Sequence, residues 1–486
     1  MTTTARTERA PSRTVRFGRR SSRGLLLGLS TSRVVAFAAA VIVVIVSLYA
    51  AGPFGLLWST PGWTTLLAAA YVPVAGRRAV EWLPVGGHWA VRRARHQISY
   101  RARVPLARPE GTLALPGDAA PLRLHVDGET GTAMVHDPYA RTLTATARVR
   151  HPAFVLLGPA DQERRVAGWG RVYATLAQSG RIARVQILER AAPDSGRGVQ
   201  DHWRTAGRPD RGFAARAYAE LVDAAGPASE KHETTVSISL DLTTARRAIR
   251  AEGGGLPGAA VVLRREISTV SAALAAAEIR VERWLDGGDL AVILRTAYDP
   301  TAARALDSQP IGRDPATAGP VAVDEQWDHL RSDSALHAVY WISEWPRSEV
   351  FPSFLSSVLL TAGVRRTVSL VAQPLSTAEA MRAIRKERVE YQTDASQRQR
   401  IGQLTDFATE QEWADVNQRE RELVAGHGDL RFAGFLSVSA PDQAGLQAAR
   451  ATIEQAAIQA GCETRLLVGQ QAQAFTAAAL PLCRGI

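Results

Sequence analysis

The residues of this chain that could do chemistry are scattered rather than grouped. Ten histidines and two cysteines occur in 486 residues, with no His-Glu-x-x-His motif and no Cys or His cluster at metal-ligand spacing. Neither Lys231 nor Lys386 follows a glycine, which excludes a Walker A phosphate-binding loop, and no Gly-x-Ser-x-Gly nucleophile elbow occurs. We therefore predict no catalytic, cofactor-binding or metal-binding residues, and a protein that is not an enzyme.

Three features could still contribute to a site, and each has a simpler structural interpretation. His427 could be a general base near neutral pH, but its Gly-His-Gly-Asp context is typical of a helix that ends at glycine. The glycine run 253–255 precedes Leu-Pro and indicates a loop between helices. Cys462 and Cys483 fit two buried thiols in a reducing compartment. A membrane-tethered enzyme would need a pocket that gathers His427, His337 or acidic groups.

The elements that would position any site begin with a long apolar region. Residues 34–76 contain no charged side chain, over about twice the roughly 20 residues that one membrane-spanning helix needs. A Gly-Pro pair at 52–53 is a natural helix stop. We predict a transmembrane hairpin with helices at about 34–51 and 55–75.

Arginine flanks this apolar region on both sides. The basic arm at 1–33 has eight arginines and one glutamate, and residues 77–103 have seven arginines and one glutamate. Since the formal net charge is +11, residues 104–486 carry −2 overall. The absence of basic residues between the two helices predicts a multi-pass protein of a bacterial inner membrane with both termini cytoplasmic.

The charge distribution also indicates partners. Anionic lipid headgroups suit the basic flanks, whereas the nearly neutral remainder supplies no general surface for nucleic acid, so no direct nucleic-acid binding is expected. The juxtamembrane segment 77–97 interleaves arginine with tryptophan, leucine and valine. It could lie as a helix in the headgroup layer or form a simple basic linker.

The remaining sequence predicts an α+β fold. A small β unit is expected at 98–150, followed by two ferredoxin-like α+β halves at 151–307 and 323–486, with a Pro/Gly-rich linker at 308–322. The first half includes a long helical pattern over 259–285. The second includes a long charged helical segment from 377 to about 425, typical of solvated helix faces.

One internal similarity supports the two halves. Asp161 stands near the start of an expected helix that ends at Gly180, and Asp442 near one that ends at Gly461, with the same spacing in both. An aspartate there can accept hydrogen bonds from free amides, and glycine can end the helix. Chance similarity between two ordinary β-α-β units explains the spacing equally well.

The C-terminal third carries a family resemblance. Its residues are Arg419-Glu-Arg-Glu-Leu, the run from Ala425-Gly-His-Gly-Asp-Leu to Phe-Ala-Gly-Phe-Leu, Ala440-Pro-Asp, Gly461-Cys, Gln470-Gln and Leu480-Pro-Leu. They resemble the N-terminal, pre-motor domain of conjugation and type IV secretion ATPases. The front of the chain is similar to the PrgI-type membrane proteins of these systems. Together these features resemble a membrane protein family of actinobacterial integrative conjugative elements.

This resemblance implies a scaffold, because the sequence departs from the ATPase pattern by lacking Walker motifs. The implied function is that of an inner-membrane component of a conjugative type IV-like secretion system. Its cytoplasmic domain would position a separate motor ATPase beside channel subunits, which raises the local concentration of the motor without catalysis. Homo-oligomer formation is left open. The alternatives are a type VII secretion membrane component and a membrane-tethered enzyme of unknown chemistry.

Overall fold

The computed structural model describes residue 17 and residues 31–74, 77–102, 109–151, 154–193, 197–207, 212–225, 230–308, 313–400, 407–426 and 428–485. The chain forms two compact units. Gly18–Ile98 make up the membrane unit, and Met1–Phe17 with Ser99–Ile486 make up the sheet domain.

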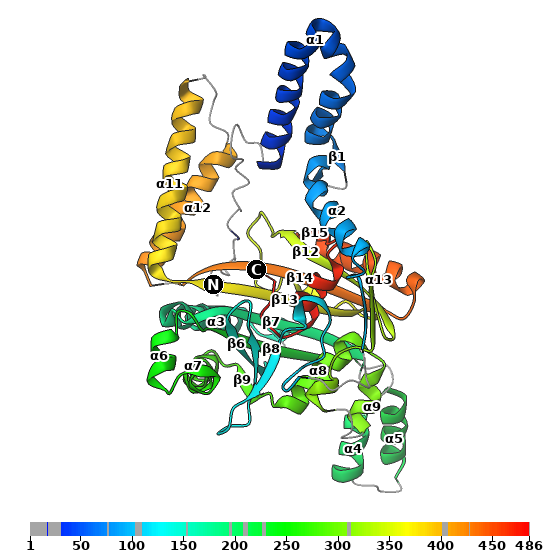
Figure 1. Ribbon diagram of the computed structural model, residues 1–486. Coiled ribbons are helices and arrows are strands. Elements are labelled where there is room, and N and C mark those ends of the chain that lie inside the picture. The colour runs from blue at the N-terminus through cyan, green and yellow to red at the C-terminus, as the bar shows by residue number, and fades with distance from the viewer. Residues whose placement is uncertain are drawn as a thin grey trace, which may run out of the picture. The chain divides into compact units, whose positions relative to one another are not determined.

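The membrane unit is built on α1 (Thr31–Tyr71), which is broken in the middle. Ala51 and Gly52 have non-helical backbone angles, and Gly52 has a φ of 58°, a conformation that glycine adopts readily. Figure 1 shows α1 turning back on itself at its far end. Ala36 and Ala70 consequently share one small apolar cluster, although they are 34 positions apart in the sequence.

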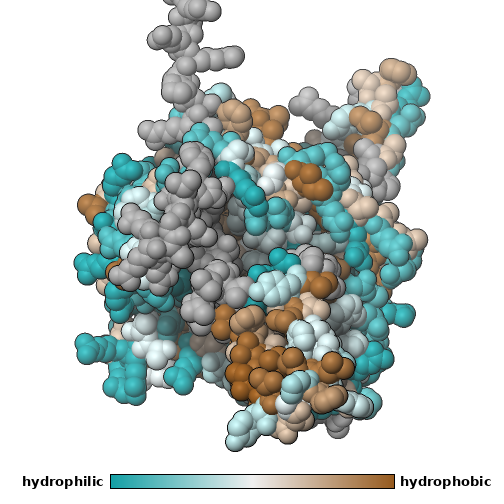
Figure 2. Space-filling view, turned by 90° about the horizontal axis from the view of Figure 1, so that it is seen from above, coloured by the Kyte–Doolittle hydropathy of each residue, from teal (hydrophilic) through white to brown (hydrophobic). Residues whose placement is uncertain are grey.

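The surface of α1 is apolar and unburied. Tyr49, Phe54 and Trp58 are 95%, 78% and 86% exposed. Figure 2, a view onto the end of α1, shows hydrophobic residues gathered in a compact patch. Among the described residues, one helix, Ser32–Tyr71, is long and apolar enough to cross a membrane, where the sequence predicted two separate helices.

The polar Ser59-Thr60-Pro61-Gly62 sequence does not end this helix. The Thr60 hydroxyl donates to the Leu56 carbonyl at 3.0 Å, and the Thr65 hydroxyl donates to the Pro61 carbonyl at 2.5 Å. These local bonds satisfy hydroxyls that would otherwise lie unpaired in an apolar environment.

The juxtamembrane segment is helical. A two-stranded ribbon of β1 (Pro73–Val74) and β2 (Arg77–Arg78) leads into α2 (Ala79–Ala94). Pro84 and the Gly86-Gly87 pair lie inside α2 without ending it. The helix is therefore compatible with the headgroup-layer alternative raised by the sequence.

The sheet domain is organised around one antiparallel sheet of 13 strands (Figure 1). Its order is β3-β10-β11-β12-β14-β13-β7-β8-β6-β5-β4, with β15 also paired to β12 and β9 to β6. The first strands are β3 (Ser99–Arg101), β4 (Arg123–Val126), β5 (Ala133–Asp137), β6 (Thr142–Arg150), β7 (Ile182–Pro193), β8 (Glu230–Asp241) and β9 (Arg280–Trp284). The later ones are β10 (Ala322–Glu325), β11 (Leu330–Ser332), β12 (Ala335–Glu344), β13 (Arg365–Leu375), β14 (Asp429–Ala440) and β15 (Glu463–Leu466).

The strands and the helices that connect them fall into two successive groups along the chain, called here the first and second series. The first series contains α3 (Pro159–Ser179), α4 (Arg197–Ala206), α5 (Phe213–Ala225), α6 (Arg246–Ala251) and α7 (Gly255–Ala276). The second contains α10 (Ser356–Leu359), α11 (Thr377–Arg400), α12 (Phe407–Val424) and α13 (Gln443–Gln459). α8 (Gly287–Tyr298) and α9 (Ala302–Ser308) follow β9, and α14 (Gln471–Ala479) follows β15.

The same strand arrangement occurs twice. In the first series β9, β6, β8 and β7 lie side by side, and in the second β15, β12, β14 and β13 lie in the corresponding order. A pair of helices is inserted at the same point of each series, α4 and α5 between β7 and β8, and α11 and α12 between β13 and β14. The two series meet where β7 pairs with β13 along Val185–Ala191.

Both faces of the sheet are covered by helices, because successive side chains of a strand point to opposite faces. One face of the sheet carries two apolar cores, the first under α3 and α7 and the second under α10 and α13. The opposite face packs on α8 and α14 through a third core that includes Val339, Val371, Phe435 and Phe475. Alternate side chains of each strand point to opposite faces, so the sheet is covered on both sides.

Several expectations from the sequence differ from the structure. The prediction of a helix over 259–285 is wrong beyond Ala276, where α7 ends. Glu278 then has a φ of 59°, and β9 begins at Arg280. The segment 377–425 is two antiparallel helices, with residues 401–406 outside the described part. The β unit at 98–150 shares its sheet with both halves.

The internal similarity also aligns helices that are not equivalent. α3 lies between the first two strands of its series, β6 and β7, whereas α13 lies between the last two of its series, β14 and β15. Asp442 caps α13 and accepts from the Gly445 amide at 2.7 Å, but α3 is capped at Gly158 and Asp161 instead pairs with Arg164. Gly180 and Gly461 end their helices with positive φ, as predicted.

Candidate functional site

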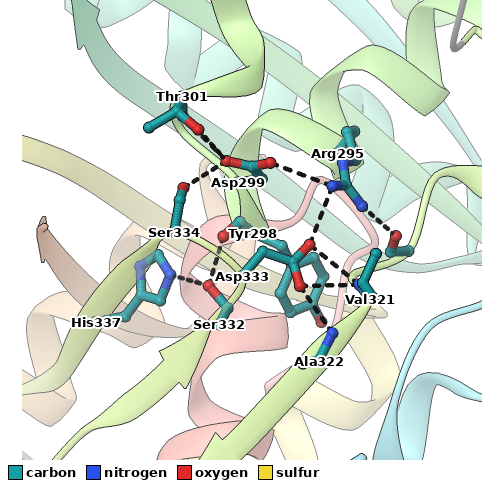
Figure 3. A network of polar contacts seen from close by, with 11 residues as sticks. Arg295, Tyr298, Asp299, Thr301, Val321, Ala322, Ser332, Asp333, Ser334 and His337 are labelled. Atoms are coloured by element: carbon teal, nitrogen blue, oxygen red, sulfur yellow. Dashed lines mark hydrogen bonds and ion pairs between the residues drawn. The ribbon is translucent and has the colours of Figure 1, made fainter. Parts of the chain in front are cut away.

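His337 on β12, one of two histidines that the sequence analysis named for a possible pocket, lies in a buried polar network (Figure 3). Its Nε2 lies 2.6 Å from the Ser332 hydroxyl on β11, and its Nδ1 lies 2.7 Å from the Ser439 hydroxyl on β14. The Ser332 hydroxyl also donates to the Tyr298 carbonyl at the end of α8. The imidazole therefore links three neighbouring strands, and Phe475 covers its ring.

Burial decides what His337 can do. It lowers the pKa of the imidazole to about 3, so the ring is neutral at pH 7. A general base works best with a pKa near the operating pH, and it needs access to the proton that it takes. His337 has a far lower pKa and is completely buried, so it positions strands instead of moving protons.

An arginine and two aspartates extend this network (Figure 3). Arg295 on α8 lies 3.1 Å from Asp299 and 3.1 Å from Asp333. Asp333 accepts from the backbone amides of Val321 and Ala322 at 2.9 and 2.7 Å, which holds the start of β10 against α8. Each charge has a partner, so this part of the network is structural.

Asp299 is the most highly coordinated carboxylate of the group. Burial would raise its pKa, but hydrogen bonds from Ser334 and Thr301 and the charge of Arg295 outweigh that effect and lower the pKa. The Thr301 hydroxyl donates to it at 2.6 Å. Asp299 is therefore ionised at neutral pH and is fully occupied by donors from its own chain.

A second polar region fixes the C-terminal segment to the sheet. The Gln186 side chain on β7 donates to the Ser369 hydroxyl and to the carbonyls of Ala477 and Leu480, and accepts from the Cys483 amide at 2.8 Å. The Pro481 carbonyl accepts from hydroxyls on β6 and β8. We call residues 477–483 the C-terminal strap. It lies on the face where the two strand series join.

The other sequence candidates are placed as follows. His427 lies outside the described residues. Gly253–Gly255 have positive φ; Gly253 and Gly254 lie between α6 and α7 and Gly255 begins α7, so the interpretation as a loop between helices is confirmed. Burial raises the pKa of Cys462 to about 11 and raises that of Cys483 further, and low exposure with a high pKa makes both thiols unreactive. Within the described residues, no group of three His, Cys, Asp or Glu could hold a metal ion.

Sequence reasoning missed the strap and its glutamine. The available signal was an alternation of hydroxyl residues, Thr142, Thr144 and Thr146 on β6 and Ser237 and Ser239 on β8. Strands with one polar and one apolar face normally place the polar face in solvent. Here both faces are buried, and the hydroxyls bind each other and the strap.

Two surface features stand out in the sheet domain. α11 and α12 pack side by side through a Tyr391–Trp413 ring stack and an Arg388–Glu420 ion pair (Figure 1). Elsewhere Phe17 of the N-terminal arm packs on Trp345, with ring centroids 5.1 Å apart. Two further rings, Phe354 and Phe432, complete this aromatic cluster beside an open groove of about 820 Å³.

Comparison with protein families gives one match. The family model described as "Putative type VII ESX secretion system translocon, EccE" matches residues 228–342. The match runs from β8 through α8 to the end of β12, and so includes most of the network around His337. No curated protein matches the chain. The match supports a secretion-system membrane component and favours the type VII alternative over the type IV interpretation.

Proposed function

We propose that this protein is a non-enzymatic, integral-membrane component of a type VII-like secretion translocon. The observation that carries the proposal is the match of residues 228–342 to the EccE family. The exposed apolar helix α1 supports a membrane location independently of that match. The proposed role is structural: the sheet domain would contact other translocon subunits, and the basic flanks of α1 would contact anionic lipids.

The proposed topology has both halves of α1 crossing the membrane. A straight helix of 41 residues would be about 60 Å long, twice the hydrocarbon core, and α1 is broken near its middle at Gly52. Phe17, which precedes α1, packs in the same compact unit as Ser99–Ile486, which follow it. An even number of crossings between them satisfies both observations and the arginine distribution.

We also infer that the sheet domain contains two related ferredoxin-like units. The order β9-β6-β8-β7 and the order β15-β12-β14-β13 both correspond to a β-α-β-β-α-β unit whose fourth, first, third and second strands lie side by side. The helical insertion at the same point of both units supports a duplication. A duplicated unit joined strand to strand is suited to a rigid platform.

Affinity purification from native membranes in mild detergent, followed by mass spectrometry, tests the function. Recovery of other type VII translocon subunits is the expected result. Recovery of a conjugation ATPase would favour the type IV interpretation instead. Recovery of no secretion subunit would contradict both.

Cysteine labelling in intact cells tests the topology. Phe54→Cys lies just beyond the break in α1 and should react with a membrane-impermeant maleimide added outside. Thr452→Cys, exposed on α13, is the matched cytoplasmic control and should react only after lysis. The native Cys462 and Cys483 are buried and should give little background. Labelling of Phe54→Cys only after lysis would refute the two-pass arrangement.

A further inference from the structure

A small cavity lies where the two strand series meet. Its floor is formed by neighbouring strands in the order β14, β13, β7, β8 and β6, and α8 and α14 provide its apolar roof. Strand register places Ser437 opposite Thr367, Thr367 opposite Arg190, and Arg190 opposite Glu233. These four side chains therefore form one row across β14, β13, β7 and β8, where the two strand series meet.

The cavity is strongly cationic. Arg148, Arg190, Lys231 and Arg365 line it, and Glu233 is the one carboxylate among the lining residues. Arg190 and Lys231 lie 2.6 and 2.9 Å from Glu233, and Arg148 lies 3.9 Å from it. Burial would raise the pKa of Glu233, but Arg190 and Lys231 hold it at about 2, so Glu233 is ionised. The lining residues carry three positive charges in excess.

Arg365 is the cation of this cavity that has no ion-pair partner among the described residues. Among the described residues, no ion pair or hydrogen bond involves its side chain. Burial and the nearby charge of Arg190 lower its pKa to about 10 against the attraction of Asp299, so it is still protonated at pH 7. Asp299 is 3.1 Å from Arg295 and accepts from Thr301. Arg365 is partly buried, and a partly desolvated cation without an ion-pair partner is unfavourable, so a bound anion would stabilise it.

Two further donors in the cavity lack partners. The Ser437 hydroxyl belongs to a side chain that is 2% exposed, and it has no hydrogen-bond partner among the described protein atoms. The Nε of Arg148 is buried and equally unpartnered. Buried polar atoms are nearly always hydrogen-bonded, so unpartnered donors lining a cationic cavity point to an acceptor that the described residues do not supply.

We propose that this cavity binds a phosphate group, held by Arg365, Arg148 and the Ser437 hydroxyl. Guanidinium groups bind tetrahedral oxyanions through paired charge-assisted hydrogen bonds, and a hydroxyl adds a neutral donor. The cavity volume of about 70 Å³ is several times the roughly 10–15 Å³ that one water needs, and it suits a small oxyanion. The phosphate is either free or the terminal group of a larger molecule whose remainder leaves past Lys231.

Calorimetric titration of the full-length protein in detergent with inorganic phosphate, at constant ionic strength, tests the site. The wild type should bind phosphate and unfold at a higher temperature in its presence. Arg365→Gln should weaken the affinity about tenfold to hundredfold, and Ser437→Ala about threefold to tenfold. Arg331→Gln, which removes an exposed strand arginine outside the cavity, is the matched control and should bind like the wild type.

A second readout separates loss of binding from loss of folding. Without phosphate, Arg365→Gln should unfold at a higher temperature than the wild type, because it removes a partly buried cation that has no ion-pair partner among the described residues. Glycerol phosphate, a monoester, distinguishes the sources: equal or tighter binding supports a terminal phosphate group, and weaker binding supports free phosphate. No binding by the wild type at millimolar phosphate would overturn the proposal. So would an equal response to acetate, or unchanged affinity in both cavity variants.

Discussion

Replacement of Gln186 by leucine should destabilise the sheet domain more than any single surface change. The side chain is completely buried and makes four hydrogen bonds of 2.8–3.1 Å. After the change, the Ala477 carbonyl and the Ser369 hydroxyl retain each other at 2.8 Å. The Leu480 carbonyl retains the Leu482 amide at 2.9 Å, whereas the Cys483 amide loses its one hydrogen-bond partner among the described residues.

The magnitude follows from this one orphaned amide. A buried polar group left without a partner costs about 1–3 kcal/mol, so Gln186→Leu should lower the free energy of unfolding by about 1–3 kcal/mol. The apolar volume is nearly retained, so cavity formation adds little. Gln447→Leu on the exposed face of α13 is the control and should change it by less than about 0.5 kcal/mol.

Urea unfolding of the full-length protein in detergent, followed by tryptophan fluorescence, measures this difference. Hydrogen exchange supplies the local test, because the Cys483 amide should exchange much faster in Gln186→Leu than in the wild type. A loss of less than about 1 kcal/mol, with the Cys483 amide still protected, would refute the assignment of the glutamine as the anchor of the C-terminal strap.

Two further predictions concern helix caps and pH. Asp442→Ala should lower the free energy of unfolding by about 1 kcal/mol, because Asp442 caps α13. Asp161→Ala should lower it by less than about 0.5 kcal/mol, because Gly158 is the cap of α3. Urea unfolding measures both, and equal losses would contradict this difference. Stability should also fall as the pH falls from about 6.5 toward 3, because His337 takes up a proton in the unfolded chain but not in the fold. The loss amounts to about 2 kcal/mol between pH 7 and pH 5, and His337→Gln should remove that part of the pH dependence. An unchanged slope of the urea midpoint against pH in this variant would show that the imidazole is protonated in the fold.

Local signals in the sequence were sufficient for much of the secondary structure. The uncharged run at 34–76 predicted the apolar helix, and the Gly-Pro pair at 52–53 predicted its break, because hydrophobic length and backbone freedom are properties of contiguous residues. The prediction that helices end at Gly180 and Gly461 is correct for the same reason. The aspartate cap was read correctly at Asp442 and wrongly at Asp161.

The tertiary structure decided which residues meet. The sequence named His337 only as a residue that an enzyme pocket would have to gather, and its pairing with Ser332 and Ser439 depends on the register of β11, β12 and β14. The cationic cavity joins Arg148 to Arg365 across 217 residues of sequence, through strands that become neighbours only when β7 pairs with β13.

The sequence by itself therefore determined the apolar N-terminal helix and the α+β character of this protein, since charge and apolar runs act over a few residues. The sheet order, the polar layer under the C-terminal strap and the shared cavity were decided by long-range strand pairing. Such pairing depends on the free energy of the whole assembled sheet, and no short segment carries that information.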